Sequence, residues 1–114
     1  MSAHTRLATY GTLAPGEVNH DKMDGMEGRW RQGRVRGRLH AEGWGADHGC
    51  PGMTPDPAGD WIDVHIFESE DLPAHWARLD DFEGAEYQRV EVTAEVDGES
   101  LPVSIYALNR RGEA

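Results

Sequence analysis

The chain has 114 residues, enough for one domain with a single core. It carries 11 Lys and Arg against 21 Asp and Glu, and this formal charge of −10 disfavours binding to nucleic acid or to an acidic membrane surface. A single cysteine excludes an internal disulfide, no apolar run reaches the roughly 20 residues of a membrane span, and the first residues lack a signal peptide's apolar stretch. We therefore expect one cytoplasmic domain, residues 1–114, that acts on a small molecule.

A short strand over residues 5–10 leads into a glycine- and proline-containing turn over residues 11–16. Gly11 can adopt backbone angles closed to other residues, and the Pro-Gly pair at the end of the turn predicts a second bend. The amides of Gly11, Thr12 and Leu13 would then converge on one small space, which suits a carboxylate or a developing oxyanion. The same residues also fit a tight loop without a binding role.

Residues 17–28 are polar and predict a loop, with room for one helical turn. The next segment, residues 29–39, contains five arginines, and Val35, Gly37 and Leu39 alternate with three of them. This pattern predicts a strand with one cationic face. We interpret the face as solvated and balancing the acidic residues, and the alternative is a docking surface for an anionic substrate or an acidic partner.

Residues 41–60 contain five Gly and three Pro, so we expect no regular element there. Long irregular segments often form binding loops. His40, Asp47, His48 and Cys50 lie close in sequence, but no second cluster completes four ligands at the spacing of a zinc site, so no metal is predicted.

Apolar and polar residues alternate over residues 61–67, which predicts a strand with Ile62, Val64 and Ile66 on one face. A helix is predicted from Asp71 to about Phe82, with its apolar residues on one side. Its start is signalled by Ser69 or Asp71 as a cap and Pro73 in the first turn, and its end by Gly84.

The last third predicts a β-hairpin. Residues 90–96 and 101–107 alternate, and Asp97-Gly98 is a strong turn signal between them. Tyr106 should point away from the face that carries Val103 and Ile105.

Glu83 immediately precedes the glycine that ends the helix. Unpaired carbonyls give this end a partial negative charge, and Asp80 and Asp81 lie within one turn, so we expect the pKa of Glu83 to be raised. A carboxylate of this kind can act as a general base near neutral pH. An acidic helix end is also commonly only a solvated one.

Two stretches together indicate a family. Residues 10–13, Tyr-Gly-Thr-Leu, are followed by Pro-Gly, and residues 79–84, Leu-Asp-Asp-Phe-Glu-Gly, are followed by Tyr87, Arg89 and Val90. They resemble the paired motifs of the gamma-glutamylcyclotransferase-like family, which includes the AIG2-like proteins and the gamma-glutamylamine cyclotransferases. The resemblance covers nearly the whole chain.

The resemblance implies a compact α+β fold, in which a mixed sheet curls into a partial β-barrel with one main helix and a pocket at one end. It implies cyclisation of a γ-glutamyl amine or amide to 5-oxoproline with release of the free amine, without metal or cofactor. Matching positions make Glu83 the catalytic base. They assign substrate binding to Tyr10, Gly11, Thr12, Leu13, Tyr87 and Tyr106.

Two positions depart from the family pattern. Ala14 stands where many relatives have a basic residue, and Cys50 precedes a proline where an aromatic residue is usual. The alternative function is therefore a binding module of the same fold that captures a carboxylate or γ-glutamyl compound without turnover.

Overall fold

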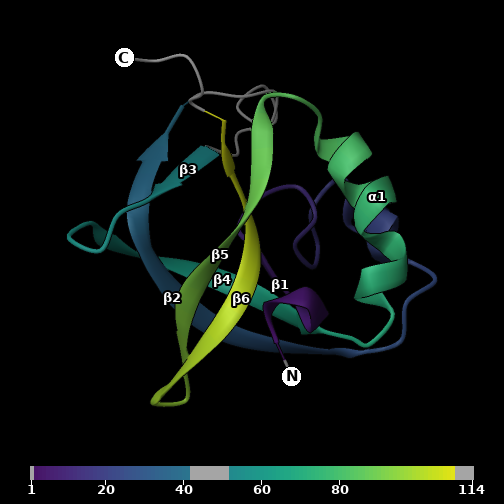
Figure 1. The fold of residues 1–114 in the computed structure, drawn as a ribbon, viewed down its shortest axis with the longest axis horizontal. Coiled ribbons are helices and arrows are strands. Elements are labelled where there is room, and N and C mark those ends of the chain that lie inside the picture. Colours follow the sequence, from purple (N-terminus) through teal and green to yellow (C-terminus); the bar gives the residue numbers. More distant parts are fainter. Residues whose placement is uncertain (1, 42–51, 110–114) are drawn as a thin grey trace.

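The computed structural model describes residues 2–41 and 52–109, which form a barrel of strands with one α-helix beside it (Figure 1). The α-helix is α1 (Leu72–Glu83), and two short 3₁₀ helices are η1 (Ala3–Thr5) and η2 (His20–Met23). The strands are β1 (Arg6–Thr9), β2 (Arg29–His40), β3 (Gly52–Pro55), β4 (Asp60–Glu68), β5 (Tyr87–Val96) and β6 (Glu99–Leu108). The predicted α+β fold with one main helix is confirmed.

The strands close into a ring. Their order is β3-β2-β4-β1-β6-β5, and β5 returns to β2 at the pair Arg34↔Glu95. Five strands therefore form the barrel, and β3 lies along the end of β2. β1 and β6 are parallel, at Leu7↔Ser104 and Ala8↔Ile105, and the other pairs are antiparallel. The sheet is mixed, as predicted.

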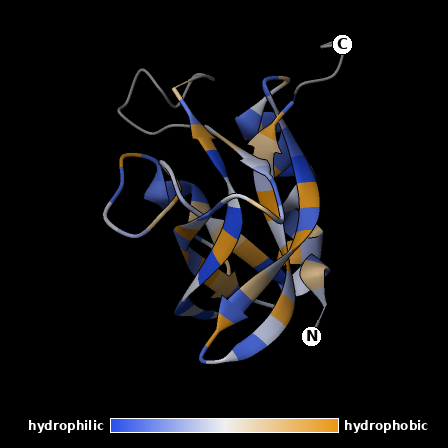
Figure 2. Ribbon diagram, turned by 90° about the vertical axis from the view of Figure 1, so that its left-hand side faces the viewer, coloured by the Kyte–Doolittle hydropathy of each residue, from blue (hydrophilic) through white to orange (hydrophobic). Residues whose placement is uncertain are grey.

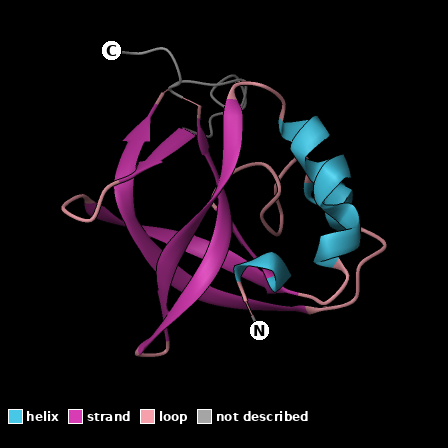
Figure 3. Ribbon diagram, in the orientation of Figure 1, coloured by secondary structure: helices cyan, strands magenta, loops and turns pink. Residues whose placement is uncertain are grey.

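Side-chain alternation along the strands separates two apolar clusters, and Figure 2 shows the alternating hydropathy along the ribbons. The first cluster fills the barrel with residues from all six strands, including Ile66, Val103 and Ile105. The second packs α1 against the barrel and contains Leu7, Phe67 and Trp76, among others (Figure 3). The predicted faces of β4 and β6 are confirmed.

The β5–β6 hairpin is also confirmed. Its turn has positive φ at both Asp97 (51°) and Gly98 (82°), as a two-residue hairpin of this kind requires. The hairpin bends back to β2 at Gly33, where a Cβ atom would lie 2.9 Å from the carbonyl oxygen of Glu95 and 2.9 Å from a methyl carbon of Val96. Only glycine allows this close approach of the two strands.

The prediction that residues 41–60 form no regular element is wrong for β3. Its residues pair with β2 from Gly37↔Pro55 to His40↔Gly52, and Met53 is fully buried. Tertiary pairing therefore outweighs the local glycine and proline content. Leu39 also departs from expectation, because it is 51% exposed instead of sharing the buried face of Val35.

The arginines of β2 are engaged within the protein. Arg34 pairs with Glu95 at 2.7 Å and Arg38 with Asp56 at 2.7 Å, while the guanidinium of Arg36 lies 4.1 Å from the centre of the Trp61 ring. The remaining two contact Glu68, Arg29 at 2.9 Å and Arg31 at 3.5 Å. These pairs support the interpretation of a charge-balanced face.

Candidate functional site

The C-terminal end of α1 places a carboxyl group against the barrel. Leu72, Trp76 and Leu79 are buried at helical spacing, which fixes the side that the helix turns to the barrel. Gly84 ends the helix with φ 79° and ψ −174°, a conformation that is essentially restricted to glycine. Glu83, the last helical residue, is only 8% exposed.

Burial raises the pKa of Glu83 to about 7. The raised pKa agrees with the expectation from sequence, but the expected cause, the neighbouring carboxylates, is wrong. Asp80 accepts hydrogen bonds from Arg89 and Tyr106. Burial alone would raise the pKa of Asp80, but these hydrogen bonds outweigh burial and lower the pKa. Asp80 is therefore ionised and paired. A carboxyl group with a pKa near neutrality can both accept and donate a proton, which suits acid-base chemistry.

The turn after β1 is tightly packed. Thr12 and Leu13 are buried, and the N–H of Ala14 donates to the carbonyl of Gly11 at 3.0 Å. The carbonyls of this turn are thus hydrogen-bonded, whereas the N–H groups of residues 11–13 donate no backbone hydrogen bond to another described residue. Gly11 does not have a positive φ, so the expected backbone reason for this glycine is wrong; Gly16, with φ 83°, makes the predicted second bend.

Three tyrosines surround this region. Tyr10 donates its hydroxyl to the carbonyl of Tyr106 at 2.7 Å, and Tyr106 and Tyr87 pack in the cluster that contains Leu13. Burial raises the pKa of Tyr10 and of Tyr106 above the usual range, and the charge of Glu83 raises both further. These interactions bring Tyr10, Leu13, Glu83 and Tyr106 into one neighbourhood, with Tyr87 at its edge.

Sequence reasoning gave no role in the site to two of its neighbours, His20 and Arg89. His20 of η2 has its Nδ1 atom 3.0 Å from the carbonyl oxygen of Leu13, and because a carbonyl only accepts, the ring donates from Nδ1. Arg89 binds both oxygens of Asp80, at 2.9 and 3.2 Å. No local pattern in the sequence signals either contact, because each joins separate elements.

No group of three or more His, Cys, Asp or Glu side chains that could hold a metal is found in residues 2–41 and 52–109. Of the four residues weighed as metal ligands, His40 lies 2.9 Å from the hydroxyl of Thr54 through Nε2. The other three, Asp47, His48 and Cys50, lie outside the described residues.

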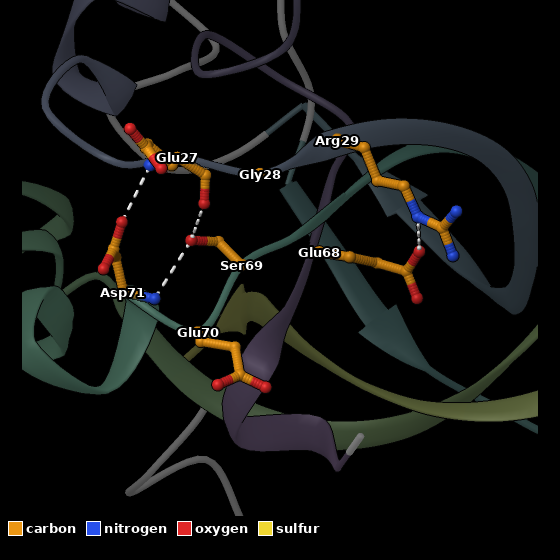
Figure 4. A pocket seen from close by; sticks show the side chains of 7 residues that line it. All are labelled: Glu27, Gly28, Arg29, Glu68, Ser69, Glu70 and Asp71. Carbon is orange, nitrogen blue, oxygen red and sulfur yellow. Dashed lines mark hydrogen bonds and ion pairs between the residues drawn. The ribbon is translucent and has the colours of Figure 1, made fainter.

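Two cavities lie away from Glu83. One, of about 430 Å³, is at the opposite end of α1, where Ser69 donates to the carbonyl of Glu27 and accepts from the N–H of Asp71 (Figure 4). The other, of about 480 Å³, lies between Trp61 and Val92 on the barrel wall. Hydrogen bonds inside the first cavity anchor the start of α1.

The described part of the chain contains no helix with the length and apolar character needed to cross a membrane.

The barrel with its single helix is the architecture of AIG2-like proteins. The chain belongs to the gamma-glutamyl cyclotransferase, AIG2-like family, whose sequence profile matches residues 7–114. No curated protein matches the chain significantly.

Solved structures share the fold. YkqA from Bacillus subtilis has a TM-score of 0.71 and 27% identity over 92% of this chain, which spans 36% of the YkqA chain. An AIG2-like protein from Mus musculus has a TM-score of 0.71 and 24% identity, covering 96% of this chain and 80% of its own. The uropathogenic E. coli protein c4763 has a TM-score of 0.71 and 24% identity, covering 93% and 80%.

Proposed function

We propose that this protein is a cyclotransferase that converts a γ-glutamyl amine or amide into 5-oxoproline and a free amine. Family membership supports the reaction class. The observation that carries the proposal is Glu83, a buried carboxyl group whose pKa burial raises to about 7 beside the Tyr10 turn. A protein that only bound anions would gain nothing from a carboxyl group buried there.

In the proposed reaction the α-amine of the substrate attacks its own γ-glutamyl carbonyl carbon. The new C–N bond closes the five-membered ring, and the bond to the departing amine breaks. The attacking group is already tethered, so the protein needs no nucleophile and acts mainly by holding the reactive conformer. Glu83 takes a proton from the attacking amine and returns it to the leaving amine.

The turn over residues 10–13 supplies the second part of the proposed site. The N–H groups of Gly11, Thr12 and Leu13 would bind the α-carboxylate or the oxyanion, and the Thr12 hydroxyl would add a further donor. Tyr10, Tyr87 and Tyr106 would form the wall. No cofactor takes part in these steps.

The test is to incubate the protein with a panel of γ-glutamyl amines and to measure release of 5-oxoproline. Glu83→Gln should lower kcat by roughly 10²–10⁴-fold, the usual contribution of a general base, while the fold stays intact. Glu86→Gln makes the same chemical change at an exposed position three residues later and should keep wild-type turnover.

Unchanged turnover in Glu83→Gln would contradict the assigned base. If the wild-type protein bound these compounds without releasing product, the binding-module alternative would replace the proposed enzyme.

A further inference from the structure

Asp80 ties the last turn of α1 to the β5–β6 hairpin. Tyr106 of β6 donates its hydroxyl to Asp80 Oδ1 at 2.6 Å. Arg89 of β5 donates from Nε to Oδ1 at 2.9 Å and from Nη2 to Oδ2 at 3.2 Å. Both carboxylate oxygens of Asp80 therefore accept hydrogen bonds, and the two-pronged contact with the Arg89 guanidinium fixes the orientation of the carboxylate.

The same tyrosine links the hairpin to the turn after β1. The carbonyl of Tyr106 accepts from the Tyr10 hydroxyl at 2.7 Å, and that hydroxyl accepts from the N–H of Met53 at 3.0 Å. Hydrogen bonds through Tyr10 and Tyr106 thus connect β3, the end of β1, β6 and α1.

Asp80 lies three residues before Glu83, so the two side chains are neighbours on one side of the helix. Any movement of the last turn that releases Asp80 would therefore carry Glu83 with it. The guanidinium of Arg89 also lies 4.3 Å from the centre of the Trp76 ring, one turn earlier. Asp80 is 44% exposed, so its ion pair adds little stability by itself, and its main effect is on geometry.

We propose that Asp80, Arg89 and Tyr106 form a clamp that holds the last turn of α1 against the barrel and keeps the Glu83 carboxyl group buried. They are positioning residues. The hydroxyl of Tyr106, which the family resemblance assigns to substrate binding, acts through Asp80. The proposal rests on the proposed function for what Glu83 does in catalysis, but the burial of Glu83 is measurable without any substrate.

The test uses Tyr106→Phe, which removes one hydroxyl group and no charge, and Arg89→Gln. The pKa of Glu83 is measured by ¹³C NMR titration of labelled glutamate carboxyl groups, with the resonance assigned by its loss in Glu83→Gln. When the clamp opens, water reaches the carboxyl group, and its pKa should fall by about one unit or more from about 7.

The direction in which the pKa of Glu83 changes distinguishes the clamp from a simple charge effect. The polar groups near Glu83 include the phenols of Tyr10 and Tyr106 and, one turn earlier on the helix, the ionised Asp80–Arg89 pair. Loss of the Arg89 cation with no movement of the helix would raise the pKa of Glu83, because a stabilising positive charge disappears. The clamp predicts the opposite.

In turnover assays we expect kcat to fall roughly 10- to 100-fold, the effect of a misplaced catalytic group, with a smaller change in KM. The acidic limb of the kcat pH profile should move to lower pH. Arg38→Gln breaks another arginine–carboxylate pair, the 2.7 Å pair with Asp56, and is the matched control. It should change neither kcat nor the pKa of Glu83.

Tyr106→Phe decides the outcome if Arg89→Gln does not fold. A folded Tyr106→Phe variant with the wild-type pKa at Glu83 would overturn the clamp. If this pKa falls while the wild-type protein releases no 5-oxoproline, the clamp stands and the proposed function fails.

Discussion

The hydroxyl group of Tyr10 donates to the carbonyl of Tyr106 at 2.7 Å and accepts from the N–H of Met53 at 3.0 Å. One hydroxyl oxygen atom therefore joins three segments that are far apart in the sequence. Burial raises the pKa of Tyr10, so the phenol keeps its proton and stays a donor throughout the physiological range.

Tyr10→Phe should lower the free energy of unfolding by about 1–3 kcal/mol, because the buried N–H of Met53 loses its acceptor. Urea denaturation measures this change. Thr5→Val is the matched control, since it removes a hydroxyl bond of 3.1 Å to the carbonyl of Ser2 in an exposed turn and should cost about 0.5 kcal/mol or less. Equal losses in the two variants would contradict the role assigned to the Tyr10 hydroxyl.

Glu83→Gln should stabilise the protein at alkaline pH. The pKa of Glu83 is about 7 in the folded state against 4.5 without burial, so the native state binds the proton more tightly and stability falls as pH rises from 4.5 to 7. The difference of about 2.5 units corresponds to at most about 3 kcal/mol. Denaturation at pH 8 should give a larger free energy of unfolding for Glu83→Gln than for the wild type. At pH 4.5 the two free energies should be similar.

Glu86→Gln is the control for this gain and should be neutral at both pH values, because Glu86 is exposed. A gain of the same size at pH 4.5 and pH 8 would show that the effect does not come from the proton on Glu83.

Glu68→Gln should destabilise the fold. Burial alone would raise the pKa of Glu68, but hydrogen bonds from Arg6 and Arg29, helped by the charges of Arg29 and Arg31, outweigh burial and lower it. The side chains of Arg6 and Glu68 are 9% and 3% exposed, so the substitution leaves a buried cation without its carboxylate. The cost should be about 3–5 kcal/mol at pH 7.

The pH dependence has a defined sign. A lowered carboxyl pKa gives stability that is present above the unfolded value, 4.5, and is lost as pH falls through the folded value. The difference in unfolding free energy between the wild type and Glu68→Gln should therefore become smaller below about pH 4. Asp97→Asn, which removes an 81% exposed partner of Arg31, should change stability by no more than about 1 kcal/mol.

Gly84→Ala and Gly98→Ala test two glycines that both have positive φ. Their φ angles are 79° and 82°, and a Cβ atom at either position meets no heavy atom within 4 Å, so each substitution adds only backbone strain. Gly98→Ala should cost about 1–2 kcal/mol in unfolding free energy, and Gly84→Ala should cost more, up to about 3 kcal/mol, because its ψ of −174° takes it outside the left-handed helical region. Only Gly84→Ala should also lower the rate of 5-oxoproline release, because Gly84 follows Glu83; equal rates in both variants would contradict this.

Local signals predict α1 and the hairpin well. Pro73 and Gly84 mark the limits of the helix, and Asp97-Gly98 marks the turn, because their backbone preferences are independent of the rest of the fold. β3 could not be predicted in the same way, since Met53 is part of a strand only because its segment pairs with β2.

The site is predicted only in part from residues alone. The glutamate at the helix end is visible in the sequence, but its burial depends on packing against the barrel, and an acidic run by itself suggests a solvated helix end. The contact between Asp80 and Arg89 joins a helix to a strand, so helical periodicity cannot reveal it.

The parallel pairing of β1 with β6 has a consequence for folding. Leu7 pairs with Ser104, so the 96 residues between them must emerge before the ring of strands can close. Glu83 is synthesised before β6, and until β6 pairs with β1 and β5 its carboxyl group lacks the packing around Tyr106. A chain that ends before β6 should therefore keep the pKa of the Glu83 carboxyl group nearer its ordinary value than the complete barrel does.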